Sequence, residues 1–505
     1  MNMLSDFKGQ SQSWKRRAAL IDAGSELSIS YRELAESIGG FGALLDKKDV
    51  REGDCVSILA RSSFHTCMAV LACLENGIVA NPLNPGLPED LIREFITDAR
   101  PALILTDDPG LIPGRLRECQ PVLPVEESLF PLVWSSGQNI SRSADSGGLL
   151  IYTSGATGTA KGVLLSMANI EANVETAAAA FGYKSGWVSG CLLPLYHTFG
   201  IISDVLPVLA TGGTVVVLPT FEMCHAKLTV DSFRKYGVRS YSAAPIIFEA
   251  FTALDCLTDT QLQFAVAGAA PLDECVKADY ETRFGHPIIP CYGLTESTCF
   301  ATISPRGAVR ANSAGKAANI EICVFDENLR SLRAGVSGEI ALRGPSVIGH
   351  GNYRNGHLDG SSVLTSDGWL LTGDLGRLDE DGYLYVTGRK KNMVIRGGEK
   401  VYLEDLDRSL LNYPGVAKSA SIVISARETW DRAISFVVAR PVAVLTREGI
   451  SDYVQKSLGS NHIPDDIVFT DAIPITATGK PNYVALKAVY QSLKSACPAV
   501  ASAIR

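Results

Sequence analysis

Residues 152–162 read Tyr152-Thr153-Ser154-Gly155-Ala156-Thr157-Gly158-Thr159-Ala160-Lys161-Gly162, and this stretch decides the fold. It follows the apolar run at 149–152, which is short enough for a buried strand. Glycines permit positive φ and close approach, hydroxyl groups donate hydrogen bonds, and Lys161 supplies a positive charge. Such a loop can turn several backbone N–H groups toward one anion. The stretch therefore predicts a phosphate-binding loop.

The spacing of this loop differs from the Walker pattern, in which G-x-x-x-x-G-K-[ST] leads into a helix. Here Lys161 precedes Gly162-Val163-Leu164-Leu165, which predicts a second strand. For the loop taken alone, a flexible surface turn stays open as an alternative. Other segments must decide between the two interpretations.

Bulk properties restrict the class of protein. A chain of 505 residues predicts two or three domains. Hydrophobic residues make up 46% and charged residues 20%, which is typical of a globular protein and not of a disordered one. The net charge of −8 argues against nonspecific binding to nucleic acid.

The sequence indicates neither secretion nor a membrane span, and it lacks several rival motifs. The N-terminus has no apolar signal region, and Pro207 and Gly212-Gly213 interrupt the apolar tract at 205–221, so we expect no membrane span. Twelve cysteines without a C-x-x-C pair predict reduced thiols in a cytoplasmic protein. The chain has no G-x-G-x-x-G, G-x-S-x-G or H-E-x-x-H, which removes the usual support for a dehydrogenase, a hydrolase or a zinc protease.

The organisation of the chain predicts an α/β architecture. From Tyr31 to about Leu329, helical segments alternate with short apolar runs, as in a largely parallel buried sheet. Residues 271–285 predict a helix and 213–218 a strand. Residues 319–386 predict a smaller β-rich subdomain with strands at 339–343 and 382–386. After Gly388, apolar residues at helical spacing in 401–412 predict a separate C-terminal domain of typical size.

Three further clusters offer groups that a nucleotide can use. In residues 291–297, Tyr292 can stack on a base, Thr295 can donate to a phosphate, and Glu296 can hold Mg²⁺. Asp374 can accept from two ribose hydroxyls, and Lys480 follows a glycine in a polar loop. Taken alone, the first cluster is at least as well explained as an ordinary loop, the second is explained as a turn, and the third is better explained as a solvated lysine.

Together and in this order, the clusters resemble the core motifs of the adenylate-forming superfamily, which includes acyl- and aryl-CoA ligases, adenylation domains of nonribosomal peptide synthetases and luciferases. The resemblance runs from residues 30–34 to Gly479-Lys480. It implies a large N-terminal domain of α/β sheets with a β-barrel subdomain, followed by a small mobile α+β domain. We therefore expect an N-terminal adenylate-forming domain at 1–388 and a mobile C-terminal domain at 389–505.

The resemblance also implies roles for individual residues in ATP binding. The opening loop would hold the β- and γ-phosphates through Thr153, Ser154, Gly155, Ala156, Thr157, Gly158 and Lys161. The adenine would be enclosed by Gly268, Ala269, Ala270, Cys291, Tyr292, Gly293 and Leu294. Thr295 would contact phosphate, Glu296 the metal, and Asp374 with Arg389 the ribose. Catalysis would involve Lys480, Thr295, Glu296 and His197.

The chemistry implied is ATP-dependent activation of a carboxylic acid. The acid attacks the α-phosphate of ATP, expels pyrophosphate and becomes an acyl-adenylate. Because two anions meet, at a cost of several kcal/mol for each close charge pair, cations are required at the developing charge. The resemblance assigns this task to Lys480, Lys161 and Mg²⁺.

The second half-reaction is implied by residues 396–406. In the superfamily the C-terminal domain rotates about a hinge, here at Lys391, and brings this segment to the site. Gly397 and Gly398 would form a wall for thiol access, although a glycine turn before a helix stays open. The segment most resembles that of CoA ligases, so we expect CoA as acceptor, or alternatively the phosphopantetheine of a carrier protein.

The substrate class follows from residues 194–200, which resemble the CoA-ligase form of a motif whose histidine, here His197, lies at the acyl pocket. The expected pocket residues are His197, Ser242, Ala243, Ala244, Ile246 and Gly268. An amino acid is disfavoured because His197 stands where amino-acid-activating relatives have an aspartate. Cys291 stands where malonate-type ligases have an arginine, which disfavours a dicarboxylate. We expect a fatty or aromatic acid.

Two departures affect ATP binding. Ala156 replaces the usual hydroxyl residue and Ala160 the usual proline. Losing one donor costs about 1 kcal/mol of phosphate binding, and losing the proline loosens the loop. The sequence thus predicts an AMP-forming acid–thiol ligase with weakened ATP affinity. A catalytically inactive nucleotide-binding regulatory protein is the alternative from another class. The acid, the acceptor, the oligomeric state and the size of the effect of Ala156 and Ala160 on ATP affinity stay open.

Overall fold

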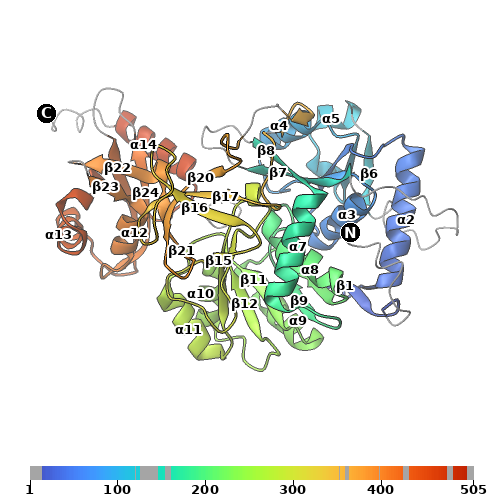
Figure 1. The fold of residues 1–505 in the computed structure, drawn as a ribbon, viewed down its shortest axis with the longest axis horizontal. Helices are drawn as coiled ribbons and strands as arrows, with labels where there is room; N and C mark the ends of the chain where they lie inside the picture. Colours follow the sequence, from blue (N-terminus) through green and yellow to red (C-terminus); the bar gives the residue numbers. More distant parts are fainter. Residues whose placement is uncertain are drawn as a thin grey trace. The chain divides into compact units, whose positions relative to one another are not determined.

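The computed structural model describes residues 14–119, 121–125, 146–153, 161–351, 353–358, 363–396, 399–424, 431–474 and 481–496 (Figure 1). The chain divides into two compact units. The first comprises Met1–Ile322 with Leu342–Leu370, and the second comprises Cys323–Ala341 with Leu371–Arg505. Over the described ranges, no helix is long and apolar enough to cross a membrane.

The strands on either side of the predicted phosphate loop belong to one sheet of the first unit. Strands β7 (Gly148–Thr153) and β8 (Lys161–Ser166) are antiparallel, with Thr153 opposite Lys161, as the sequence predicts for two strands around the loop. The sheet order is β19-β18-β8-β7-β4-β3-β5-β6. The other strands are β3 (Cys55–Leu59), β4 (Val79–Pro82), β5 (Leu103–Thr106), β6 (Val122–Pro124), β18 (Tyr353–Arg354) and β19 (His357–Leu358). Neighbours from β6 through β7 are parallel.

A second sheet of this unit carries most of the other predicted site residues. Its order is β15-β14-β13-β12-β11-β9-β10-β1-β2. The strands are β1 (Ala18–Asp22), β2 (Ser28–Ser30), β9 (Val188–Cys191), β10 (Thr214–Val217), β11 (Ser240–Ala243), β12 (Phe264–Ala267), β13 (Ile288–Tyr292), β14 (Thr302–Ile303) and β15 (Gly315–Ala317). From β1 to β13 the neighbours are parallel, which confirms the predicted parallel α/β sheet.

Helices cover both faces of this second sheet because its strands are apolar on both sides. The α-helices of the first unit are α2 (Tyr31–Lys47), α3 (Ser63–Glu75), α4 (Glu89–Ala99), α5 (Gly114–Cys119), α7 (Met167–Phe181), α8 (Leu206–Ala210), α9 (Ala226–Tyr236), α10 (Pro245–Leu254) and α11 (Glu274–Phe284). Phe264 and Val266 pack in the core that includes α7 and α8, whereas Ala265 and Ala267 pack in the core that includes α9 and α10. The predicted helix near 271–285 is confirmed as α11, capped by Asp273.

The second unit begins with four strands that are neighbours in the order β16 (Glu321–Phe325), β17 (Gly338–Arg343), β20 (Leu370–Leu378) and β21 (Tyr383–Arg389). The first two residues of β16, the last two of β17 and the first of β20 are assigned to the first unit. It continues with β22 (Met393–Arg396), β23 (Glu399–Tyr402), α12 (Leu403–Leu411), β24 (Val416–Ile424), β25 (Arg432–Ala439), α13 (Arg447–Leu458), β26 (Asp466–Phe469) and α14 (Tyr483–Ala496). The expected small α+β module is present. The helix predicted over 401–412 begins only at Leu403, because Val401 and Tyr402 pair with β22. Gly388 lies within β21, and the domain boundary there stays a prediction.

Candidate active site

The predicted phosphate loop starts and ends on paired strands. Thr153 ends β7 and Lys161 begins β8, and Thr153 Oγ1 donates to the Lys161 carbonyl at 3.4 Å. The strand pairing therefore places the Thr153 hydroxyl and Lys161 at the two ends of the loop. The remaining predicted loop residues, Ser154, Gly155, Ala156, Thr157 and Gly158, lie outside the described residues.

A close-packed wall forms where β12 and β13 end. A Cβ atom at Gly268 would lie 2.8 Å from Phe199 Cζ and 2.9 Å from Cys291 Sγ, so this position accepts only glycine without displacement. The Cys291 thiol donates to the Ala267 carbonyl at 3.1 Å. Ala269, the next predicted residue, has φ of 68°, a left-handed conformation that costs free energy for a non-glycine residue. Ala270 follows it and is exposed.

The segment after β13 is a strained turn that presents Thr295 and Glu296. The Leu294 N–H donates to Ser297 Oγ at 3.1 Å, and the Ile348 N–H donates to the Glu296 carbonyl at 2.9 Å. Thr298 has φ of 68° and is fully buried, with its hydroxyl donating to the Ser346 carbonyl at 2.7 Å. These bonds hold the two predicted catalytic side chains in one local geometry.

Tyr292 and Gly293 precede this turn. Tyr292 ends β13, pairs with Thr302 of β14 and is half-buried. A Cβ atom at Gly293 would lie 1.6 Å from the Cys299 carbonyl oxygen, so a side chain at this position is incompatible with the turn.

Glu296 fits a magnesium ion that arrives with a nucleotide. The described residues contain no group of three or more His, Cys, Asp or Glu side chains placed to hold a metal by themselves. Mg²⁺ in nucleotide sites is bound by one or two carboxylates together with phosphate oxygens. A single half-buried carboxylate such as that of Glu296 matches this requirement.

The residues predicted for the acyl pocket separate into groups. Ser242 lies with Ser203 and Asp204, whereas Ala243, the next residue of β11, packs in the core on the opposite face. Ala244 is the buried N-cap residue of α10, and Ile246 is 44% exposed. The His197 ring packs edge-on against Tyr196 at a centroid distance of 4.9 Å. Of the six residues predicted for the acyl pocket, Gly268 lies beside Phe199. That all six line one pocket stays a prediction.

Sequence reasoning missed Asp204. This residue lies in a π-helical segment, η3 (Gly200–Val205), directly after the His197 motif, and its side chain is fully buried. The available signal was a single charged residue, preceded by Ser203, within the largely apolar stretch 200–210. An ionisable group at such a place is rarely buried without a specific reason.

In the second unit, the predicted ribose residues form an ion pair. Asp374 of β20 and Arg389 of β21 are opposite each other in the antiparallel ladder, and Arg389 Nε lies 2.7 Å from Asp374 Oδ1. The Asp374 side chain is 6% exposed and that of Arg389 is 47% exposed. The sheet register therefore fixes the aspartate, and the arginine covers it from the solvent side.

The predicted hinge is a short 3₁₀ turn, η6 (Lys390–Asn392), which contains Lys391. Lys390 Nζ lies 2.9 Å from Glu339 Oε2, and Asn392 Nδ2 donates to Glu404 Oε1 at 3.0 Å. Burial raises the pKa of Glu404, although the Asn392 amide and the charge of Arg389 oppose this rise. Both ends of the turn are thus held by carboxylates of the same unit.

The predicted thiol-access segment is a hairpin formed by β22 and β23. Arg396 anchors it, because its guanidinium donates to the Asn461 carbonyl at 2.9 Å and also to the Ile463 carbonyl and the Asp465 carboxylate. Gly397, Gly398 and the predicted catalytic Lys480 lie outside the described residues.

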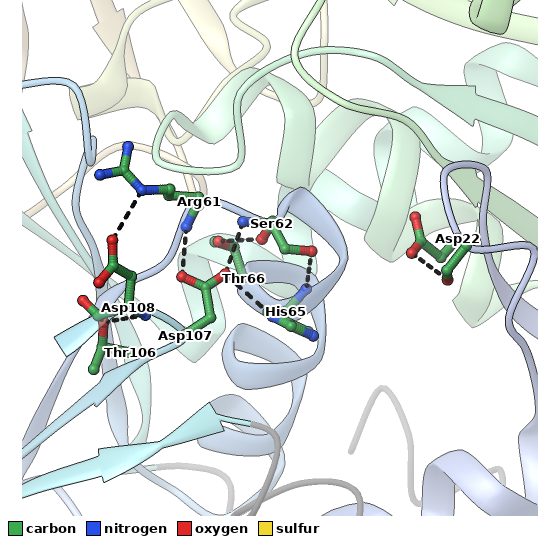
Figure 2. Close-up of polar contacts among 9 residues, drawn as sticks. Asp22, Arg61, Ser62, His65, Thr66, Thr106, Asp107 and Asp108 are labelled. Carbon is green, nitrogen blue, oxygen red and sulfur yellow. Dashed lines mark hydrogen bonds and ion pairs between the residues drawn. The ribbon is translucent and has the colours of Figure 1, made fainter. Parts of the chain in front are cut away.

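A serine, a histidine and an aspartate also meet at the start of α3, as Figure 2 shows, but they form a helix cap. Ser62 Oγ accepts from the His65 backbone N–H at 3.2 Å, and Asp107 accepts from the backbone N–H groups of Arg61 and Ser62, each at 2.9 Å. The His65 ring lies 3.1 Å from Asp107 Oδ2. Because the hydroxyl and the carboxylate both accept from backbone N–H groups of the helix start, the geometry is that of capping and not of nucleophilic catalysis.

Comparison with known proteins gives consistent matches over nearly the whole chain. Residues 7–349 match the family model of the AMP-binding enzyme, and residues 405–480 match that of the AMP-binding enzyme C-terminal domain. A probable CoA ligase of Humulus lupulus is 27% identical, with 92% of each chain covered. An oxalate–CoA ligase of Arabidopsis thaliana is 26% identical, covering 86% of this chain and 88% of that protein. The o-succinylbenzoate CoA synthetase of Bacillus subtilis, in complex with its acyl-adenylate, superposes with a TM-score of 0.82 at 25% identity, over 96% and 98% of the two chains.

Proposed function

From the premise that this chain belongs to the AMP-binding enzyme family, we propose that it activates an aromatic or fatty acid as its acyl-adenylate and transfers the acyl group to CoA. The protein is an AMP-forming acid–CoA ligase. The class of acid and the roles of individual residues are the parts that we propose.

In the first step, a carboxylate oxygen of the acid bonds to the α-phosphorus of ATP. The bond from that phosphorus to the bridging oxygen breaks, and pyrophosphate leaves. Lys480 offsets charge at the α-phosphate, the loop at 153–161 holds the β- and γ-phosphates, and Asp374 orients the ribose. Mg²⁺, held by Glu296 when bound with ATP, supplies further positive charge at the phosphates.

In the second step, the thiol sulfur of CoA bonds to the carbonyl carbon, and the bond from that carbon to the AMP oxygen breaks. The thiol proton passes to solvent. The segment around Gly397 and Gly398 guides the thiol, after the domain at 389–505 has turned about Lys391.

The observation that carries this proposal is the match of both family models over the segments that hold the required groups. Lys161, Glu296 and the wall at Gly268 fall within the first match, and Lys480 ends the second. The buried Asp374 supports the ribose site independently, because the ion pair with Arg389 at 2.7 Å and the register of β20 with β21 fix its position.

The class of acid rests on this chain's own residues. Two of the matched relatives are named for oxalate and o-succinylbenzoate, both dicarboxylic acids, and another is named for indoleacetate, a monocarboxylic acid. In this chain Cys291 contributes a neutral thiol at the wall beside Gly268, and Phe199 packs against the same glycine. A monocarboxylic acid with an apolar body suits these neighbours better than a second carboxylate does.

The test is a panel of aromatic, fatty and dicarboxylic acids, assayed by ATP–pyrophosphate exchange and then by thioester formation. We expect exchange with a subset of the monocarboxylic acids and a thioester with CoA. If the acyl group is transferred only to phosphopantetheinylated carrier proteins, the acceptor is a carrier protein and not CoA. Failure of every acid to support exchange would overturn the proposal in favour of a nucleotide-binding regulatory protein.

A further inference from the structure

The buried carboxyl of Asp204 is held on one oxygen and unpartnered on the other. Asp204 Oδ1 accepts from Ser242 Oγ at 2.6 Å, and Ser242 Oγ lies 2.5 Å from Ser203 Oγ. Asp204 Oδ2 has no hydrogen-bond partner, although the residue is fully buried. Leaving such an atom unsatisfied costs about 1–3 kcal/mol, so the fold retains a group that it does not itself satisfy.

Neighbouring polar groups of the same face are satisfied within the protein. Trp187 Nε1 donates to Ser240 Oγ at 2.9 Å, and Ser189 Oγ donates to the Ser240 carbonyl at 3.2 Å. Ser240 is two residues before Ser242 on β11 and is equally buried. These neighbouring groups thus have partners within the protein, whereas Asp204 Oδ2 has none.

The position of Asp204 connects it with the wall at Gly268. Phe199, the residue before η3, packs on Gly268, and Ser242 pairs with Val266, two residues before Gly268 on the adjacent strand. Burial raises the pKa of the Cys291 thiol, which lies against Gly268 on the other side, and Asp204 adds to this rise when it is ionised. A π-helical turn, a geometry frequent at functional sites, carries Asp204 within this arrangement.

One hydroxyl bonds to Asp204, that of Ser242 on β11, and Ser203 of η3 bonds to Ser242 in turn. The groups that interact with Asp204 electrostatically are a phenol and thiols, those of Tyr183, Cys191, Cys291 and Cys299. None of the ion pairs found among the described residues involves Asp204. The burial of the Asp204 carboxyl is therefore explained neither by an ion pair with a cation nor by pairing with a second carboxylate.

We propose that Asp204 is a specificity-determining residue that hydrogen-bonds a hydroxyl group on the acid, at the end remote from the reacting carboxylate. This inference rests on the proposed acid activation. A hydroxyl suits the site because it both donates and accepts. Burial raises the pKa of Asp204 to about 8, so the neutral carboxyl is the main form at pH 7 and it can donate to the substrate oxygen. An ammonium group fits less well, because a neutral carboxyl does not offset its charge.

The test compares each hydroxylated acid with its deoxy analogue, for example 4-hydroxybenzoate with benzoate and ω-hydroxy with unsubstituted short-chain fatty acids. In ATP–pyrophosphate exchange, we expect the wild type to favour one hydroxylated series by about tenfold or more in kcat/KM, because a site built for a hydroxyl rejects the analogue that lacks it. Asp204→Val should abolish this preference, whereas Asp204→Asn, which keeps hydrogen-bonding capacity, should retain most of it. A merely structural role would lower activity with both acids and leave their ratio unchanged.

Two further variants keep the test decisive. Ser242→Ala removes the hydroxyl that orients the carboxyl and should also lower the preference. It serves as the test if Asp204→Val does not fold. Asp407→Asn is the matched control, because the Asp407 carboxylate also accepts from a serine, Ser421 Oγ at 2.6 Å, and burial raises its pKa to about 7. Its acid preference should equal that of the wild type.

The outcomes separate this inference from the proposed function. Exchange with equal kcat/KM for both members of every pair, or an unchanged preference in Asp204→Val, overturns the role of Asp204 and leaves acid activation intact. If no acid supports exchange, the proposed function fails. Thermal-shift titration with the same acids then tests the role of Asp204. Stabilisation of the wild type, but not of Asp204→Val, by hydroxylated acids supports the proposed site. The absence of such stabilisation overturns the proposed site.

Discussion

At the scale of single residues, the most restrictive position is Gly268. Its missing side chain permits Phe199 Cζ and Cys291 Sγ to lie where a methyl group would otherwise sit, at 2.8 and 2.9 Å from the Cβ position. We expect Gly268→Ala to displace these side chains and lower kcat/KM for the acid about tenfold or more, since misplacement near a reacting group is costly. Steady-state kinetics with varied acid measures this effect.

Gly39→Ala is the matched control for this substitution. Gly39 lies within α2, and no atom lies within 4 Å of its Cβ position. The change should leave kinetics unaffected and raise stability by about 0.5–1 kcal/mol, the usual gain of alanine over glycine in a helix. Equal kinetics for Gly268→Ala and the wild type would contradict the assignment of Gly268 to the acid site.

Asp374 provides a second prediction at this scale. Asp374→Asn removes the negative charge proposed to accept from the ribose hydroxyls, so KM for ATP should rise about tenfold, which corresponds to about 1.4 kcal/mol. Stability should change by less than about 1 kcal/mol, because the partner Arg389 is half-exposed. Glu321→Gln breaks the exposed ion pair with Arg343, 2.6 Å long, and should leave KM unchanged. An unaltered KM in Asp374→Asn would rule out the ribose role.

At the scale of elements, strands and helices with strong local signals were predictable. Strands β7 and β8 and helix α11 follow from apolar runs, glycines and the Asp273 cap. The start of α12 was predicted two residues too early, because pairing of Val401 and Tyr402 with β22 overrides their helical spacing. The π-helical segment η3 has no local sequence signal, since it forms among residues that read as an ordinary apolar helix.

The cap of α3 gives a prediction about stability and pH. Burial tends to raise the pKa of Asp107, but hydrogen bonds from His65 and from the N–H groups of Ser62 and Arg61 outweigh it, and the pKa is lowered (Figure 2). A carboxylate with a folded pKa below its unfolded value stabilises the fold above the unfolded value, near 4, and loses this contribution as pH falls through the folded value.

We therefore expect Asp107→Ala to lower the free energy of unfolding by about 1–3 kcal/mol at pH 7, with the deficit shrinking below about pH 4. Urea titrations at pH 7 and at pH 3 measure the difference in the free energy of unfolding between Asp107→Ala and the wild type. Glu36→Gln, at the exposed Glu36–Arg32 pair, is the control and should cost less than about 0.5 kcal/mol. A deficit for Asp107→Ala that is constant from pH 7 to pH 3 would contradict the electrostatic contribution.

At the scale of the whole molecule, the chain is proposed to work as two parts, 1–388 and 389–505, that turn about Lys391. The compact units of the structure group Cys323–Ala341 and Leu371–Leu378 with the C-terminal residues, because strands β17, β20 and β21 are neighbours. That grouping concerns packing, whereas the proposed boundary concerns motion.

Domain rotation predicts that the two half-reactions depend on different residues. Lys480→Ala should abolish adenylation, with at least about a hundredfold loss of ATP–pyrophosphate exchange, because a cation at the developing charge is removed. Thioester formation from a supplied acyl-adenylate should be largely retained. Lys487→Ala, in α14, is the control and should affect neither half-reaction. Equal losses in both half-reactions for Lys480→Ala would contradict the rotation.

The sequence by itself determined the chemistry of this protein, because the required groups are carried by short local motifs. The segments proposed to act on ATP are recognisable within a few residues each, and their order identifies the family; they are the loop at 153–161, the Thr295-Glu296 turn, Asp374 and Lys480. The tertiary structure alone decided which distant side chains meet. Asp204 and Ser242 are 38 residues apart, and the wall at Gly268 joins three separate segments. Burial and unsatisfied hydrogen bonds arise only when such segments pack together, and so the residue proposed to select the acid became visible only in the fold.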